Sequence, residues 1–244
     1  MTKTTPLLIL ITFFISACSD SGKSTQAQDS SNKSSAQSAS QGRSCLDKYQ
    51  AEPWTLFTLE ELANFANLPA SDGVMEKPIE MKNLSSRATG VKWNTGRTMT
   101  TEVTGDMKIP VSDTLTFGRF EILDPERIEG SFVDYFYNHY RSTTEEEQAQ
   151  LEQAFAKELE NEGDLTKEIG QGFVNISNSI NFQTIDGIGD AASWKTNPKS
   201  PDGFLHVLHK NMTFVVVTNL NDDRNYNLGV AKKLGLAIIE KCAS

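Results

Sequence analysis

The chain has 244 residues, of which 38% are hydrophobic and 23% are charged, and its formal net charge at pH 7 is -9. Nucleic-acid binding depends on clustered Lys and Arg that neutralise phosphates, so this acidic balance argues against a nucleic-acid partner. It argues equally against electrostatic attachment to anionic lipid.

An export signal is predicted at the N-terminus. Lys3 precedes an apolar run from Leu7 to Ile15, which has the length of a signal-peptide core and is too short to span a bilayer. The run ends in Ile15-Ser16-Ala17-Cys18, which resembles the lipobox of bacterial lipoproteins. That resemblance implies a signal peptide over residues 1–17 and acyl groups on Cys18 that anchor the mature chain to a membrane. An ordinary signal peptide with a chance cysteine is the alternative.

A tether follows the lipidated cysteine. Residues 19–44 contain no Leu, Ile, Val, Met or aromatic residue, so they bury too little apolar surface to offset the entropy of ordering. A Ser-rich coil of this length spans roughly 28 Å. We therefore expect residues 18–44 to hold a domain away from the membrane without fixing its orientation.

One globular domain is predicted over residues 45–244, although length alone also permits two. The two remaining cysteines, Cys45 and Cys242, stand at the first and nearly the last residue of this region. In an oxidising envelope this placement suggests a disulfide that joins the two ends, and two separate buried thiols are the alternative. The closed loop would stabilise the fold by roughly 5 kcal/mol.

The first predicted helix begins at Thr58-Leu59-Glu60-Glu61, which has the pattern of a capping box. Apolar residues then recur at helical spacing to Ala66, and Pro69 is expected to end the run. Two segments rich in Thr, Phe and Ile, Met99 to Val103 and Leu115 to Leu123, are predicted strands. The alternation slips at Gly118, where we expect a bulge.

Two further helices are predicted in the middle of the chain. Aromatic residues recur with helical spacing and give the first an aromatic face: Phe132, Tyr135, Phe136, His139 and Tyr140. Thr143 to Glu146 is predicted to cap the second, whose apolar stripe runs to Leu159 before Gly163 ends it.

The last third of the chain predicts a hairpin and a helix. Phe204 to His209 and Met212 to Thr218 are strand-like and only two residues apart, which favours an antiparallel hairpin. Phe214 to Val217 is apolar without alternation, as in a central strand covered on both faces. Asn221-Asp222-Asp223 then supplies capping side chains for a helix, and these residues share one of its faces: Leu228, Ala231, Gly235, Ile238 and Cys242. An α+β fold, with an antiparallel sheet flanked by helices, satisfies all these patterns.

Three landmarks resemble a family of small bacterial lipoproteins and sensor domains with a PsbP-like fold. They are Cys45 followed by the segment from Leu56 to Leu62, then Thr89-Gly90-Val91-Lys92-Trp93, then the segment from Gly187 to Trp194. The resemblance implies an antiparallel sheet flanked by helices and a non-catalytic envelope protein whose ligand is unknown. Residues 130–165 depart from the family pattern as a helical insertion.

The sequence contains no recognisable catalytic or metal-binding pattern. Of the three histidines, His206 and His209 differ by three positions on a predicted strand, so their side chains should point to opposite faces and not form a metal pair. Gly187-x-Gly189 is typical of a turn into a strand here, and not of a dinucleotide site. We therefore predict no enzyme activity, no metal and no cofactor. Paired carboxylates for glycoside cleavage stay open, because 32 acidic residues allow many spatial pairs.

Three aromatic residues are candidates for ligand contact. Trp54 lies in a loop before the first helix and suits an exposed contact, whereas Trp194 is expected in the core. Tyr135 and Tyr140 are expected to line a groove or, alternatively, to cover the sheet.

These features predict a membrane-anchored envelope lipoprotein whose domain binds a partner protein or a small envelope ligand. A periplasmic hydrolase is the first alternative. An immunity or inhibitor protein whose acidic face binds a basic toxin or enzyme is the second. Ser19 follows Cys18, where inner-membrane lipoproteins often carry Asp, so the outer membrane facing the periplasm is expected if the host is Gram-negative.

Overall fold

Alternating apolar side chains and close cross-strand pairing build a large antiparallel sheet. The structure, a computed structural model, describes residues 44–76, 81–99, 108–158, 180–197 and 200–242. The predicted signal peptide, Cys18 and the tether up to residue 43 lie outside these residues, as do Leu159 and Gly163.

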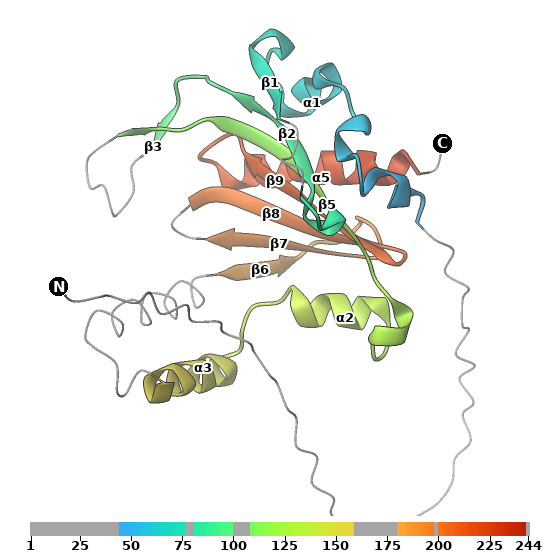
Figure 1. Cartoon of the computed structure of the whole chain (residues 1–244). Helices are drawn as coiled ribbons and strands as arrows, with labels where there is room; N and C mark the ends of the chain where they lie inside the picture. The colour runs from blue at the N-terminus through green and yellow to red at the C-terminus, as the bar shows by residue number, and fades with distance from the viewer. Residues whose placement is uncertain (1–43, 77–80, 100–107, 159–179, 198–199, 243–244) are drawn as a thin grey trace, which may run out of the picture. The chain divides into compact units, whose positions relative to one another are not determined.

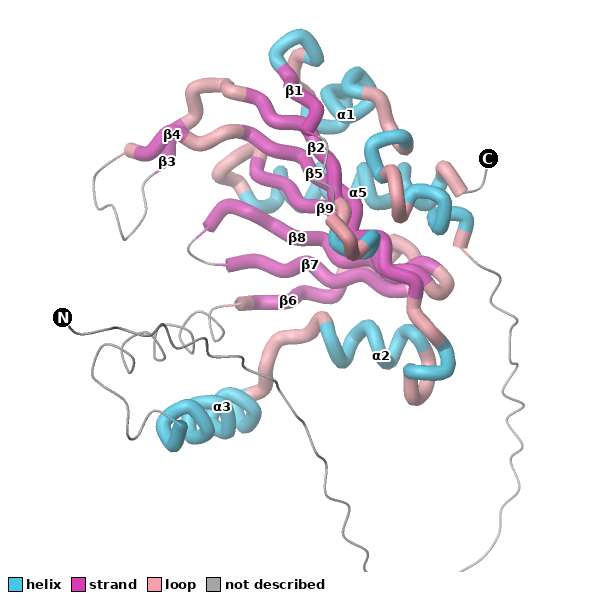
Figure 2. Tube along the Cα trace, in the orientation of Figure 1, coloured by secondary structure: helices cyan, strands magenta, loops and turns pink. Residues whose placement is uncertain are grey.

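Seven strands form the main sheet in the order β1-β2-β5-β9-β8-β7-β6, and every neighbouring pair is antiparallel (Figure 2). Their bounds are β1 Gly73–Glu76, β2 Ala88–Trp93, β5 Asp113–Ile122, β6 Asn181–Thr184, β7 Ala191–Asn197, β8 Ser200–His209 and β9 Met212–Asn219. A separate two-stranded ribbon pairs β3 (Thr98–Met99) with β4 (Ile109–Pro110). Strand β9 therefore lies at the centre of the sheet, as its continuous apolar run predicts.

Helices cover both faces of this sheet, so the predicted α+β class is confirmed. The α-helices in the described part of the chain are α1 Leu59–Ala66, α2 Phe132–His139, α3 Glu145–Glu158 and α5 Arg224–Glu240. Two short 3-10 helices, η1 (Cys45–Tyr49) and η2 (Pro53–Thr55), precede α1. Figure 1 shows α1 and α5 together on one side of the sheet and α2 beyond β6, away from them. None of the described helices is both long and apolar enough to cross a membrane.

The main core lies between the sheet and the helices α1 and α5. Alternate residues of β8 and β9 are fully buried and belong to this cluster, among them Leu205, Val207, Phe214 and Val216. Close packing depends on Gly235 of α5, because a Cβ atom there would lie 3.3 Å from Leu205 Cδ2. Trp194 is buried in the same core, as predicted.

A smaller apolar cluster lies on the opposite face beneath α2. Phe136 is fully buried against Leu123, Ala191 and Leu208, and partly buried aromatic residues of α2 surround it. This part of the predicted insertion therefore contributes to the packing of the domain.

The glycine-rich segment before β7 is a structural turn, as its pattern predicts. Gly189 has φ 60° and a Cβ atom there would lie 2.3 Å from the Leu208 carbonyl oxygen. The Asp190 carboxylate accepts a 2.5 Å hydrogen bond from the Lys210 N–H, and the Asp190 N–H donates to the Leu208 carbonyl over 2.8 Å. The turn thereby fastens the start of β7 to the β8–β9 hairpin.

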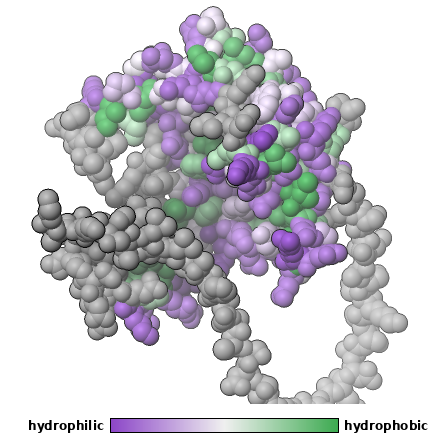
Figure 3. Space-filling model, in the orientation of Figure 1, coloured by the Kyte–Doolittle hydropathy of each residue, from purple (hydrophilic) through white to green (hydrophobic). Residues whose placement is uncertain are grey.

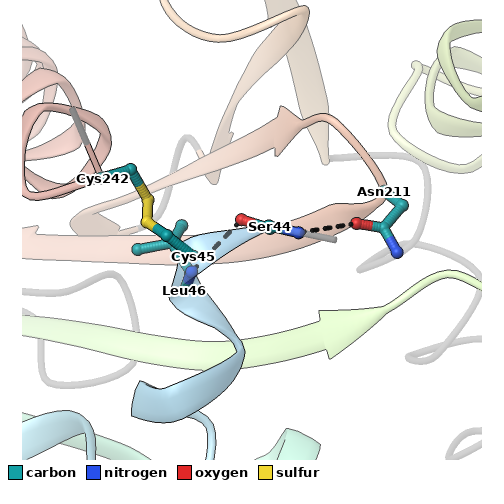
Figure 4. The surroundings of a disulfide bond; sticks show 5 residues. All are labelled: Ser44, Cys45, Leu46, Asn211 and Cys242. Atoms are coloured by element: carbon teal, nitrogen blue, oxygen red, sulfur yellow. Dashed lines mark hydrogen bonds between the residues drawn. A yellow bond between two sulfur atoms is a disulfide. The ribbon is translucent and has the colours of Figure 1, made fainter. Parts of the chain in front are cut away.

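A disulfide joins Cys45 of η1 to Cys242 beyond α5, with Cα atoms 5.4 Å apart (Figure 4). Beside it, the Ser44 N–H donates to Asn211 Oδ1 over 3.3 Å, and Ser44 Oγ accepts from the Leu46 N–H. The first described residues are thus attached both to the C-terminal helix and to the β8–β9 turn.

Most predicted elements are confirmed, and three helix boundaries are corrected. Helix α5 ends at Glu240, so Cys242 follows the helix and does not lie on its face as predicted. Helix α1 ends at Ala66, before Pro69, because Asn67 adopts the left-handed conformation at φ 53° and caps the helix. The N-terminal capping pair of α3 is Thr144 and Glu147, one residue later than expected, with mutual bonds of 2.9 and 3.2 Å. Of the predicted strand from Met99 to Val103, only Met99 is described, and it is the last residue of β3.

Candidate ligand-binding groove

The capping box of α1 places a carboxylate at the surface beside the core. Thr58 Oγ1 accepts from the Glu61 N–H over 3.2 Å, and Glu61 Oε2 accepts from the Thr58 N–H over 2.8 Å. The hydrogen bond from the Thr58 backbone is the main cause that lowers the pKa of Glu61, and the hydrogen bond from Lys241 adds to it. Glu61 is therefore ionised at neutral pH.

Lys241 brings an ammonium group to the same place from the end of α5. Its Nζ lies 3.0 Å from Glu61 Oε1 and 5.1 Å from the centroid of the Phe57 ring. A cation at the C-terminus of a helix is favoured by the helix dipole. Phe57 in turn packs edge-on against Phe117 of β5 with centroids 5.4 Å apart, which anchors the ring to the sheet.

Two cavities meet at these three residues, and we call the pair the α1–α5 groove. The first has a volume of about 400 Å³ and is lined by Phe57, Glu61, Asn64, Phe65, Ala237, Glu240 and Lys241. The second has a volume of about 540 Å³ and is lined by Trp54, Thr55, Leu56, Phe57, Thr58, Glu61, Met75 and Lys241. Both volumes lie within the range of roughly 300–1,000 Å³ that small-molecule sites occupy.

Trp54, a predicted contact residue, lines this groove. It stands in η2, and its side chain is partly buried, so one part of the indole packs while another faces the cavity. Trp93 is different, because it is buried in β2 and its Nε1–H donates to the Pro69 carbonyl over 3.0 Å. Of the three tryptophans, Trp54 is therefore the one placed to touch a ligand.

No protein-family model, no curated protein and no solved structure matches this chain. The likeness to the PsbP-like lipoproteins therefore stays a prediction. Function is therefore inferred from the groove and the residues around it.

The structure does not bring Trp54 together with Tyr135 and Tyr140. Tyr140 stacks on His206 of β8 with centroids 4.2 Å apart and planes inclined by 24°. His206 alternates along β8 with Leu205 and Val207, which face the main core, so the two tyrosines lie on the other face of the sheet. The domain thus presents two aromatic sites on opposite faces.

His206 and His209 point to opposite faces, as their spacing predicts. Burial, together with the positive charges of Lys195 and Arg119, lowers the pKa of His206 to about 3. His209 is more exposed, and burial lowers its pKa as well. Both imidazoles are consequently uncharged at neutral pH.

Phe57 and Lys241 are among the groove residues that sequence reasoning missed. They are separated by most of the chain, and the disulfide at Cys242 holds Lys241 beside the α1 segment. Lys241 immediately precedes Cys242, so the predicted disulfide was the one sequence signal that pointed to this meeting of the two ends.

On the face that Figure 3 presents, hydrophobic residues form separate patches among hydrophilic ones. A few large apolar side chains are well exposed, among them Val74 of β1 and Ile122 of β5. Such isolated side chains are ordinary on soluble surfaces and require no partner. The groove differs from them because its aromatic rings surround an ion pair.

Proposed function

We propose that this chain is an envelope lipoprotein, held to a membrane by the lipid on Cys18, whose domain binds a partner protein through the α1–α5 groove. The observation that carries the proposal is the position of Trp54 and Phe65 around the Glu61–Lys241 pair. Partly buried aromatic side chains beside charged groups are the typical anchors of protein interfaces.

The chemistry of the groove defines the segment it would take. Phe57, Phe65 and Trp54 offer apolar surface for one aromatic or aliphatic side chain of the partner. Glu61 and Lys241, with side chains 42% and 37% exposed, place an acidic and a basic group at the rim. The partner would therefore insert an apolar side chain and place backbone amide groups against this ion pair.

The tether supports the same role. If residues 18–44 form the tether that the sequence predicts, the domain could search the space near a membrane. The disulfide and the Ser44–Asn211 hydrogen bond keep the domain's own end rigid where the stalk begins. A small envelope ligand in the same groove is the second possibility, and it is an outcome of the experiment below.

Site-specific photo-crosslinking tests the binding role. Asn64 is exposed and lines the groove, so a photoreactive p-benzoylphenylalanine at this position should yield a crosslinked adduct of defined mass in living cells. The same group in place of Ile122, which is 42% exposed on β5, is the matched control. Trp54→Ala should remove the Asn64 adduct and leave expression unchanged.

The outcomes are distinct. A protein adduct at Asn64 that depends on Trp54 supports the proposal. Adducts that form equally at position 122, or that persist in Trp54→Ala, would contradict it. If a purified small envelope molecule binds and no protein adduct forms, the ligand of the groove is a small molecule and not a protein.

Metabolic labelling tests the anchor separately. A clickable fatty acid should label the wild-type chain and leave Cys18→Ser unlabelled, because only the cysteine thiol accepts the lipid. The unlabelled variant should also leave the membrane fraction. Label that survives in Cys18→Ser would refute the anchor without bearing on the groove.

A further inference from the structure

A row of alternating aromatic and cationic side chains crosses the face of the sheet that lies opposite α5. Phe182 of β6 is registered with Lys195 of β7, and Lys195 is registered with Phe204 of β8. Residues in register on neighbouring antiparallel strands project from the same face. Because Phe204 alternates with Leu205 of the main core, this row lies on the side of Tyr140 and His206.

Lys195 stands between the two rings of this row. Its Nζ lies 5.9 Å from the centroid of Phe182 and 5.6 Å from that of Phe204, within the range of cation–π attraction. Among the described residues, Lys195 forms no ion pair. Within the described part of the chain, this ammonium group therefore contacts the two rings and no carboxylate.

Tyr140 and His206 add a second aromatic pair next to this row. The Phe182 centroid lies 6.4 Å from Tyr140 and 6.1 Å from His206. The Ser193 hydroxyl donates to the Tyr140 carbonyl over 2.8 Å, which holds the end of α2 above β7. We call Tyr140, Phe182, Lys195, Phe204 and His206 together the aromatic–cationic face.

The bulge in β5 brings a second cation towards this face. The register of β5 with β9 shifts between Gly118 and Glu121, and Arg119 occupies the left-handed conformation at φ 52°. Arg119 is near enough to lower the pKa of both Tyr140 and His206 by its charge. It is exposed and forms no ion pair in the described segments, while Glu121 is the one acidic group that acts on Tyr140.

Beyond Phe204, the same face of the sheet continues over residues without aromatic rings. In register with Phe204 lies Val217 of β9, followed by Thr116 of β5 and Gly90 of β2. These side chains are small, and none of them rises above the sheet as an aromatic ring does. Phe182 and Phe204 thus lie at one end of a row that continues over Val217 and Thr116.

We propose that the aromatic–cationic face binds a small organic anion with a flat aromatic part. Lys195 and Arg119 would hold the anionic group, because both carry a positive charge that no carboxylate pairs within the described residues. The ring would lie against Phe204 and the small residues beside it, as aromatic groups stack in offset or edge-on geometry. This site is separate from the α1–α5 groove, since the two are on opposite faces of the sheet.

Two dyes of one skeleton test the proposal on the full chain. The probe is 1-anilinonaphthalene-8-sulfonate, an aromatic anion, and its neutral counterpart is N-phenyl-1-naphthylamine, which lacks the sulfonate. In fluorescence titrations, Lys195→Gln and Arg119→Gln should each lower the affinity for the anionic dye by at least about tenfold, because a charge-assisted contact is lost. The affinity of the neutral dye should change less than about twofold, because apolar contact does not depend on these charges.

Matched variants locate the site. Lys195→Arg should retain the anionic dye, and Lys233→Gln, which removes an exposed cation from α5 on the opposite face, should leave its affinity unchanged. Trp54→Ala should also have no effect, so the result is independent of the groove. Thermal melts by circular dichroism verify folding, and Arg119→Gln, at an exposed position, remains informative if Lys195→Gln does not fold.

Three results would overturn the proposal. The first is an affinity for the anionic dye that neither Lys195→Gln nor Arg119→Gln changes. The second is an equal loss of both dyes, which would indicate general apolar binding. The third is loss of the anionic dye in Trp54→Ala, which would place it in the α1–α5 groove.

Discussion

His206 stacks on Tyr140 with ring centroids 4.2 Å apart, yet neither imidazole nitrogen of His206 has a hydrogen-bond partner in the structure. A buried donor or acceptor that lacks a partner costs about 1–3 kcal/mol. Burial also lowers the pKa of this histidine to about 3, so the ring is uncharged at neutral pH. The position therefore carries a polar group where an apolar ring would satisfy the packing.

His206→Phe is expected to raise the free energy of unfolding by about 1 kcal/mol at pH 7, because Phe keeps the stacking and removes both unsatisfied nitrogens. Urea denaturation followed by circular dichroism measures the change. His139→Phe is the control, since His139 is exposed and its replacement should shift stability by less than about 0.5 kcal/mol. A loss of stability in His206→Phe would show that water or a ligand satisfies the nitrogens.

The wild type should lose stability in acid in part through His206. Its folded pKa of about 3 lies below the unfolded value of about 6.5, so the unfolded chain binds more protons between these values. The contribution is complete above about pH 6.5 and falls as the pH drops towards 3. Urea midpoints at pH 7 and pH 4 should therefore differ less in His206→Phe than in the wild type, and an equal difference would refute this account.

The disulfide should account for a large share of stability. It closes a loop with a sequence separation of 197 residues, so the double variant Cys45→Ser, Cys242→Ser should lose up to about 5 kcal/mol of unfolding free energy. Chemical denaturation measures the loss, and reducing agent should affect the wild type alone. Equal midpoints with and without reductant would show that the bridge does not stabilise the domain.

Two glycines should respond oppositely to replacement by alanine. Gly229 lies in α5 with nothing within 4 Å of an added Cβ atom, so Gly229→Ala should stabilise by about 1 kcal/mol through helix propensity. Gly203 lies against the Trp194 ring, and an added Cβ atom would stand 1.9 Å from Trp194 Cζ2. Gly203→Ala should therefore lower the melting temperature, and a neutral effect would mean that the Trp194 ring moves freely.

Asn227 should be the most sensitive polar residue of α5. It is fully buried, its Oδ1 accepts from the Leu220 and Asn221 N–H groups, and its Nδ2 donates to the Asn221 carbonyl. Asn227→Ala leaves these groups unpaired and should cost about 3 kcal/mol. Asn225→Ala, on the exposed side of the same helix, is the matched control, and a similar cost in both variants would contradict the role of the buried amide.

Local rules were sufficient for several parts of the fold. The capping box of Thr58 and Glu61, the two-residue turn between β8 and β9 and the bulge after Gly118 all depend on interactions within a few residues of sequence. The disulfide partner was also readable, because only Cys45 and Cys242 remain once Cys18 is assigned to the lipid. The buried Asn227 was missed, since its three partners become close only when β9 meets α5.

The candidate sites depended on contacts between distant segments. Trp54 was predicted as a contact residue, but its neighbours Met75 and Lys241 come from other parts of the chain. Tyr140 was predicted to line a groove, and only the tertiary structure showed that it stacks on His206. The cross-strand partner of His206 is Ser193, two residues before Lys195 on β7. The sequence by itself determined helices α1, α2 and α5, the β8–β9 hairpin and the disulfide pairing, because these follow from short-range geometry and composition. The tertiary structure decided the order of the strands and which faces carry Trp54 and Tyr140. Local patterns are compatible with several strand orders, and the burial of apolar surface selects one of them.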